Sequence, residues 1–317
     1  MKFTDLTQRS ISYLARKIDY LFKPVSQIFD YDAYNGPAQE QPRRVLQQIN
    51  EDDFHKELIL TTYFTSKADP QKKIFMPNDD FSYIGEFYSS VLEHDLYAVI
   101  FYDNLSKEFV EKHTCDNIKF VKCRIIKYSL NDERFFIYRE FLKRIEIEKI
   151  ILADVNDVTF GKNPFEMIQQ DRFYIGRDHH ALVKGSEWIQ NKLSLLPQNI
   201  KERIPVLFGN MPLVNAGVIG GDARTVINFV EKVAALLAYA DNNNNNNMAC
   251  VNIAFFDSYW LPYHKNPAIK LKYLRNQDIK KLTEQLQISS KKFLMGKPFT
   301  SHFWKFEKGN ASYIYHK

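Results

Sequence analysis

The chain has 317 residues, of which 45% are hydrophobic and 26% charged, so it can form a buried core. The net charge is +5, and the sequence shows no dense Lys/Arg stripe or nucleic-acid motif, which argues against a nucleic-acid partner. Three cysteines (Cys115, Cys123 and Cys250) match neither a disulfide framework nor a zinc site and favour reduced thiols in the cytoplasm. We find no signal-peptide core and no apolar run near the roughly 20 residues that span a bilayer.

Two segments come before the regular part of the sequence. Residues 4–29 carry apolar side chains at helical spacing and more basic than acidic side chains, which predicts a basic amphipathic helix. Such a helix either packs on its own domain or a partner subunit, which we favour, or contacts the inner face of an anionic membrane peripherally. Residues 30–56 are polar and turn-rich. We therefore interpret residues 1–56 as a helix and a linker, followed by one domain at residues 57–317.

Strands and helices alternate from residue 57 onwards. We expect strands at Glu57–Phe64, Leu96–Tyr102, Ile118–Ile126 and Lys149–Ala153, and helices at Phe81–Glu93, Ser106–Lys112 and Glu133–Ile145. This alternation predicts an α/β fold with a mostly parallel, Rossmann-like sheet and helices on both faces. In such sheets, ligands bind beyond the carboxyl ends of the strands.

The second half of the sequence is less regular. Residues 206–209 and 216–219 are typical of short strands, and residues 225–239 and 248–256 of helices. Between the two helices is a run of six asparagines, residues 242–247. Because Asn favours turns and left-handed backbone, we expect this run to form a mobile surface loop.

The strand at 149–153 is followed by a group of oxygen-bearing side chains: Asp154, Asn156 and Asp157. Alternate residues of a strand point the same way, so Asp154 and Asn156 could share a face, while Asp157 needs the strand to turn. Carboxylates at a strand end can hold Mg²⁺ or Mn²⁺ against a diphosphate. The alternative is a polar turn in which Asp157 caps the following element.

The residues Asp157-Val158-Thr159-Phe160, followed by Asn163-Pro164-Phe165, resemble a block of the GT-A glycosyltransferases. The resemblance is strongest to the glycogenin-like and mannan galactosyltransferase-like families, in which a strand ends in Asp-x-Asp. Here Val155 stands at the first motif position, and Asp154 comes one residue earlier. The metal site that the resemblance implies is therefore either formed by Asp154 and Asp157 or weakened.

Two later segments resemble the same families. Pro212–Gly221 is similar to their Asn-Ala-Gly segment, which implies that Asn215 holds a hydroxyl of the donor sugar and that Gly217 lets backbone approach it. The alternative is a tight turn between strands. Asn247 stands before the helix at 248–256, where related enzymes often have an Asp near the reacting sugar. That segment can equally be a buried helix preceded by a loop.

Further contacts are implied by position in the same families. Thr61, Thr62 and Tyr63 end the first strand, where the nucleotide base and ribose bind, although a Tyr there is also typical of packing. Arg134 would steady the nucleotide sugar or the acidic motif, or else merely belong to the first turn of its helix. The remaining candidates, from the segment 301–309, are His302 for the metal and Lys305 and Lys308 for the diphosphate.

The resemblance implies a cytoplasmic GT-A enzyme with a nucleotide-binding half at 57–160 and an acceptor half at 161–317. It would move a sugar from a nucleotide diphosphate sugar, with UDP favoured, to a glycan or lipid-linked acceptor, assisted by Mn²⁺ or Mg²⁺. A sugar nucleotidyltransferase is an alternative, but residues 61–73 lack the glycine-rich loop that it needs. A non-catalytic sugar-nucleotide-binding protein is the other alternative.

Overall fold

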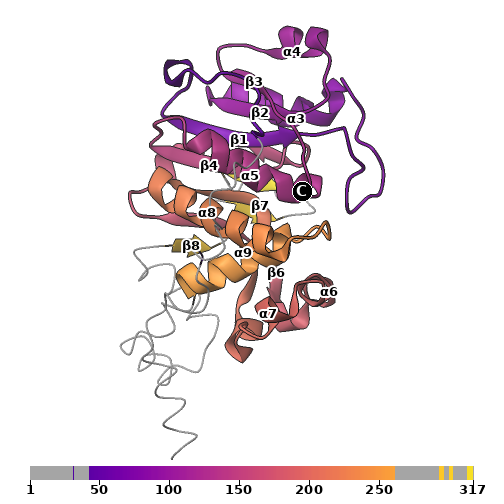
Figure 1. Cartoon of the computed structure of the whole chain (residues 1–317). Coiled ribbons are helices and arrows are strands. Elements are labelled where there is room, and N and C mark those ends of the chain that lie inside the picture. Colours follow the sequence, from indigo (N-terminus) through magenta and orange to yellow (C-terminus); the bar gives the residue numbers. More distant parts are fainter. Residues whose placement is uncertain (1–30, 32–42, 261–292, 296–299, 303–312, 317) are drawn as a thin grey trace, which may run out of the picture.

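The computed structural model describes residues 31, 43–260, 293–295, 300–302 and 313–316. The predicted helix at residues 4–29 lies outside them. The described chain is a mixed α/β fold arranged around one seven-stranded sheet, in which the strands follow the order β3-β2-β1-β4-β7-β6-β8. Figure 1 shows the sheet running from β3 near the top of the view down to β6 and β8.

Six of the seven strands run in one direction, and β7 alone runs against its two neighbours. The strands are β1 (Glu57–Tyr63), β2 (Ala98–Tyr102), β3 (Ile118–Lys122), β4 (Lys149–Ala153), β6 (Phe173–Leu182), β7 (Pro212–Asp222) and β8 (Phe293–Met295). A second sheet contains β5 (Val158–Phe160), β10 (Ile314–His316) and β9 (Thr300–His302), in the order β5-β10-β9. The expected mostly parallel sheet is confirmed.

Helices cover both faces of the large sheet. The α-helices are α3 (Phe81–Glu93), α4 (Lys107–His113), α5 (Leu130–Leu142), α6 (Glu187–Ser194), α7 (Gln198–Lys201), α8 (Ala223–Ala240) and α9 (Asn247–Phe255). Short 3-10 turns occupy Glu51–Asp53, Pro164–Met167, Val183–Gly185 and Val206–Asn210, and a π-helical turn occupies Phe256–Trp260.

The core has two layers because side chains of a strand alternate between faces. Leu58 and Leu60 of β1 pack with α5, α8 and α9, while Ile59 and Tyr63 pack with α3 and the small sheet. This double burial explains why the strands contain nearly continuous apolar runs and could be located from sequence.

Some expectations about local structure were wrong. Residues 206–209 form a 3-10 turn rather than a strand, and Val206 is 96% exposed, so its apolar character does not reflect burial. The strand expected at 216–219 is the middle of the longer β7. The end of the predicted linker is part of the domain, because Arg44 and Val45 are buried and Val45 pairs with Cys123 beside β3.

The two sequence halves, 57–160 and 161–317, share one sheet, since β7 lies hydrogen-bonded between β4 and β6. Among the described helices, none has the length and apolar content needed to cross a bilayer. Cys115, Cys123 and Cys250 are free thiols, as their spacing predicted.

Candidate metal centre

A tight turn after β4 brings two carboxylates together. The strand ends at Ala153, Asp154 follows, residues 155–157 form the turn, and β5 begins at Val158. Val155 is 3% exposed and packs in the core. Because Val155 points inward and the chain turns, the side chains of Asp154 and Asp157 lie close together. Their spacing of three residues therefore brings two carboxylates together, as the spacing of two in Asp-x-Asp does along a straight strand.

The third member of the group is His316 on β10, which pairs antiparallel with β5 so that His316 lies opposite Val158. One oxygen of each carboxylate and one imidazole nitrogen all lie within 4.8 Å of one another. We call Asp154, Asp157 and His316 the DDH cluster. The His316 Nε2 atom is 3.6 Å from Asp157 Oδ2 and 4.0 Å from Asp154 Oδ2.

Burial and charge act in opposite senses on this histidine. His316 is 6% exposed, and burial alone would lower its pKa. The hydrogen bond to Asp157 and the charges of both carboxylates outweigh burial and the opposing charge of Arg134, so the pKa of His316 is raised. Asp157 Oδ1 is buried without a hydrogen-bond partner among the described residues. This buried oxygen, beside a second carboxylate and an imidazole, is an arrangement that suits a bound cation.

Arg134 on α5 fixes the orientation of the first carboxylate. Its Nη1 forms an ion pair with Asp154 Oδ1, and its Nη2 donates to the carbonyl of Ala216 at 3.1 Å. Burial would lower the pKa of Arg134, but Asp154 and other neighbours raise it overall, so the side chain remains a cation. With Oδ1 held by Arg134, Asp154 turns Oδ2 towards His316.

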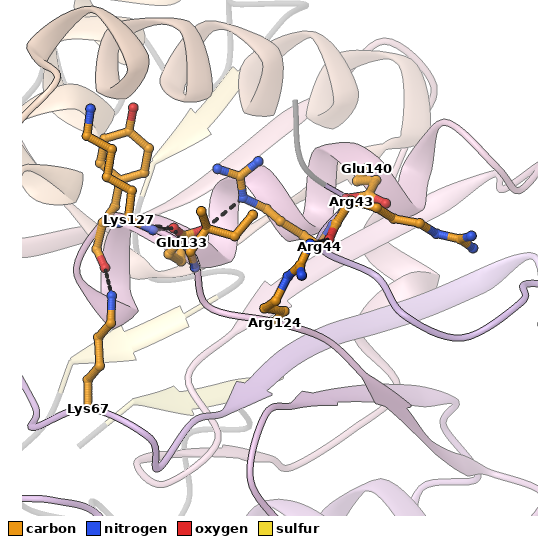
Figure 2. Close-up of polar contacts among 9 residues, drawn as sticks. Arg43, Arg44, Lys67, Arg124, Lys127, Glu133 and Glu140 are labelled. Carbon is orange, nitrogen blue, oxygen red and sulfur yellow. Dashed lines mark hydrogen bonds and ion pairs between the residues drawn. The ribbon is translucent and has the colours of Figure 1, made fainter. Parts of the chain in front are cut away.

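The neighbouring Glu133 anchors the loop that leads into α5. Its fully buried carboxylate accepts hydrogen bonds from three successive backbone N–H groups, those of residues 126–128, and from Arg44 Nε at 2.7 Å. Figure 2 shows Arg44 and Lys127 around Glu133, with Lys67 donating to the carbonyl of Tyr128. Ser129 caps the helix, its side chain accepting from the N–H of Asp132. This network fixes the start of α5 and hence Arg134.

Gly217 lies directly against the DDH cluster. Its carbonyl accepts from the N–H of Asp154 at 2.9 Å. A Cβ on Gly217 would come within 2.3 Å of His316 Cε1 and 2.8 Å of Asp154 Oδ2. The small-residue segment of β7 is therefore needed to accommodate the cluster. Asn215 is half-buried, and its side-chain oxygen accepts from the N–H of Gly217.

The residues that end β1 differ in what they can contact. Tyr63 is fully buried, its hydroxyl donates to the carbonyl of Pro77 at 2.5 Å, and its ring stacks on Tyr83 with centroids 4.9 Å apart. Thr61 is also fully buried, whereas Thr62 is half-buried. The Tyr63 ring thus packs inside the core, which is the alternative left open for a tyrosine at this strand end.

Sequence reasoning missed Tyr83 on α3, an aromatic residue whose hydroxyl is influenced by both cluster aspartates. It is half-buried, and burial first, then the charges of Asp154, Asp157 and Asp69, raise its pKa. The pattern of α3 predicts a helix but gives no sign that this residue would lie near a strand end from elsewhere in the chain.

Asn247 is the first residue of α9 and is buried against α5. The asparagine run to which it belongs was expected to be a mobile surface loop. The carboxylate of Asp132 accepts from the backbone N–H of Asn246 at 3.1 Å and of Asn247 at 2.7 Å. Asn245, Asn246 and Asn247 are each at most 3% exposed. The side-chain oxygen of Asn247 has no partner among the described residues. The second half of the run is thus part of the core.

Three further predicted residues lie wholly or partly outside the described part of the chain. The backbone of His302 lies in β9 opposite His316, but its side chain lies outside the described set, as do Lys305 and Lys308. The described histidine at the carboxylates is His316. Its signal in the sequence is the alternation of Tyr313–His316, which places Ile314 and His316 on the same side of a short strand.

The DDH cluster combines two carboxylates and an imidazole at the carboxyl end of a central strand, with a fixed arginine behind one carboxylate. That is the donor set and location at which an α/β sheet can hold a divalent cation and a phosphorylated ligand. No family model matches the chain, and no curated protein matches it. Its function is therefore inferred from the fold and the geometry of the cluster.

Proposed function

We propose that the chain is a metal-dependent glycosyltransferase of the GT-A type that uses a nucleotide diphosphate sugar as donor. The observation that carries this proposal is the convergence of Asp154, Asp157 and His316 within 4.8 Å where β4 ends. The mixed α/β sheet with helices on both faces is compatible with such a fold. The resemblance of the segments at 154–165 and 212–221 to GT-A enzymes gives the reaction class.

The residues of the DDH cluster fit a divalent cation. Carboxylate oxygens suit Mg²⁺ and Mn²⁺, and the imidazole tips the preference towards Mn²⁺. Asp157 contributes a buried oxygen without a partner among the described residues, and Gly217 leaves the space that any side chain would fill. Three protein ligands leave positions for phosphate oxygens. A bound cation would neutralise the negative charge that develops on the leaving diphosphate.

The residues around the DDH cluster would orient its ligands and bind the donor, and would take no part in bond making or breaking. Arg134 holds Asp154 in one orientation. The Asp154 carboxylate would therefore lose little conformational freedom when a cation and a diphosphate bind. Asn215 lies two residues before Gly217 on β7 and would offer its side chain to the donor sugar. Thr62, at the end of β1, is half-buried and close to the position where the nucleotide is expected.

The test is turnover of a panel of nucleotide diphosphate sugars, with and without Mn²⁺, by the full chain. The expected result is hydrolysis or transfer that EDTA abolishes and Mn²⁺ restores. Asp157→Ala should lose both turnover and Mn²⁺ binding by calorimetry while keeping its melting temperature. Asp116→Asn is the matched control, because Asp116 is an exposed acid away from the cluster.

The alternatives give different results in the same assay. A sugar nucleotidyltransferase would consume a nucleoside triphosphate and a sugar phosphate and release pyrophosphate. A non-catalytic protein would bind Mn²⁺ and the nucleotide without turnover. Full activity in Asp157→Ala, or nucleotide binding indifferent to Mn²⁺, would rule out the proposed role of the DDH cluster.

A further inference from the structure

A rigid hairpin follows β1 and presents lysines and apolar residues to solvent. Ala68 and Phe75 form an antiparallel bridge, and the N–H of Asp69 donates to the carbonyl of Ile74 at 2.7 Å. The Asp69 side chain accepts from the N–H groups of Gln71 at 2.8 Å and Lys72 at 2.6 Å. We call residues 68–75 the 68–75 hairpin. Internal hydrogen bonds fix the conformation of the hairpin, and this conformation holds its exposed side chains in solvent.

The exposed side chains of this hairpin are large apolar groups and lysines. Ile74 is 57% exposed and Phe75 is 65% exposed, and Lys72 and Lys73 come directly before them. The one acidic side chain of the hairpin, Asp69, is occupied by the turn. Neither lysine forms an ion pair with an acidic group in the described part of the chain. Adjacent exposed apolar groups beside unpaired cations are typical of contact with an anionic, partly apolar surface.

Helix α6 presents a similar face. Trp188 and Lys192 are separated by four residues and Leu195 follows three later, so the three side chains lie along one side of the helix. Trp188 is 41% exposed and Leu195 is 46% exposed, while Ile189 and Leu193 on the other side are buried. Lys192 likewise has no ion-pair partner within the described ranges.

The two elements lie on the same side of the molecule, beside the DDH cluster. In Figure 1 the loop after β1 and helix α6 both project on the right of the view. Burial lowers the pKa of Lys192, Asp132 opposes that shift, and the charge of Lys73 adds to it, so the two lysines are close enough to repel. Asp69 and both cluster aspartates act together on Tyr83. The hairpin and α6 therefore flank the approach to the cluster.

We propose that residues 72–75 together with Trp188, Lys192 and Leu195 form a membrane-docking surface for an anionic lipid bilayer. The apolar side chains enter the boundary between headgroups and acyl chains, and the lysines bind the anionic headgroups. Because this surface lies beside the DDH cluster, docking would hold the cluster against the bilayer; that this serves a lipid-linked acceptor rests on the proposed function. The inference concerns binding alone and can be tested without turnover.

The test is co-sedimentation of the full chain with vesicles of phosphatidylcholine, alone or mixed with phosphatidylglycerol. The expected result is binding to the anionic vesicles only. Ile74→Ser/Phe75→Ser should weaken partitioning by about tenfold or more, because two exposed apolar groups no longer enter the bilayer. Lys72→Gln/Lys73→Gln should weaken it by about tenfold on the anionic vesicles. Leu92→Ser, at a 43% exposed residue of α3, is the matched control and should leave binding unchanged.

A local probe separates this surface from binding through residues 1–30. Phe75→Cys, in a Cys115→Ser background, carries an environment-sensitive fluorophore, and Leu92→Cys carries the same label as control. Anionic vesicles should shift the emission at position 75 to the blue and leave position 92 unchanged. The proposal is overturned if vesicles bind without that shift, or if no vesicle binds. A shift caused by soluble oligosaccharides but not by vesicles would also overturn it and would make the hairpin a glycan platform.

Discussion

Gly217 and His316 touch so closely that a single added carbon on Gly217 would lie 2.3 Å from the imidazole Cε1 and 2.7 Å from Nε2. The contact joins β7 of the large sheet to β10 of the small one. Because His316 is buried, its ring cannot swing into solvent to relieve the overlap. His316, a proposed metal ligand, can therefore take its position only because residue 217 of β7 has no side chain.

We expect Gly217→Ala to displace His316 and weaken Mn²⁺ binding by at least about tenfold, with a loss of roughly 1–3 kcal/mol in the free energy of unfolding from overpacking. Calorimetric titration and urea unfolding measure the two effects. Gly185→Ala is the control, since no atom lies within 4 Å of the Cβ it would add. Unchanged Mn²⁺ affinity in Gly217→Ala would remove His316 from the ligand set.

A double-mutant cycle on Arg134 and Asp154 tests whether these two residues stabilise each other. Arg134→Lys keeps the charge but cannot contact both Asp154 and the Ala216 carbonyl, and Asp154→Asn leaves a buried arginine without its partner. Each should cost about 2–3 kcal/mol, below the roughly 3–5 kcal/mol of a fully buried pair, because the Asp154 side chain is 27% exposed. Urea unfolding of the double variant should show a coupling of about 1 kcal/mol or more. Simple additivity would contradict the pairing.

Glu133→Gln should destabilise the chain by about 3–5 kcal/mol, because it removes the negative charge that pairs with the buried Arg44 guanidinium and weakens the acceptor of three backbone N–H groups. Since Arg134 is the next residue, Mn²⁺ affinity should fall as well. Glu111→Gln removes an exposed pair with Lys107 and should change stability by at most about 0.5 kcal/mol. Equal effects of the two substitutions would argue against the anchoring role of Glu133.

The buried Asp132 gives a prediction for pH. Burial raises its pKa above 3.8, although the N–H groups of Asn246 and Asn247 and the Ser129 side chain oppose the shift. The folded chain thus holds this proton more tightly than the unfolded chain, so the contribution of Asp132 to stability falls as pH rises above 3.8 through the folded-state pKa. The stability of wild type relative to Asp132→Asn should decrease over that range. Urea unfolding of both proteins at a series of pH values measures it, and a difference that grows with pH would contradict the direction of the shift.

The sequence predicted the strands and helices around the first half of the sheet because those segments are buried on both faces. Lys149–Ala153 and Phe81–Glu93 were placed with the bounds that the structure has. The strand β6 was not predicted, since the segment 173–182 mixes apolar, charged and histidine residues. Its place in the sheet is decided by pairing with β7, which a local pattern does not contain.

The candidate site was predictable to the extent that it is local. Asp154 and Asp157 belong to one turn, and Gly217 and Arg134 were named from their segments. His316 comes from a strand whose partner, β5, lies about 150 residues earlier, so no spacing rule identifies it. The burial of Asn245–Asn247 was missed for the same reason, because it depends on Asp132 in a different helix.

The antiparallel strand β7 has a consequence for how the chain can be divided. It supplies the hydrogen bonds of one whole side of β4, although it belongs to the second half of the sequence. A fragment ending at residue 160 would leave four aligned strands with β4 as a bare, apolar edge, which invites pairing with other copies. We therefore expect the two halves to fold together, and a separate N-terminal half to need a substitute for that strand.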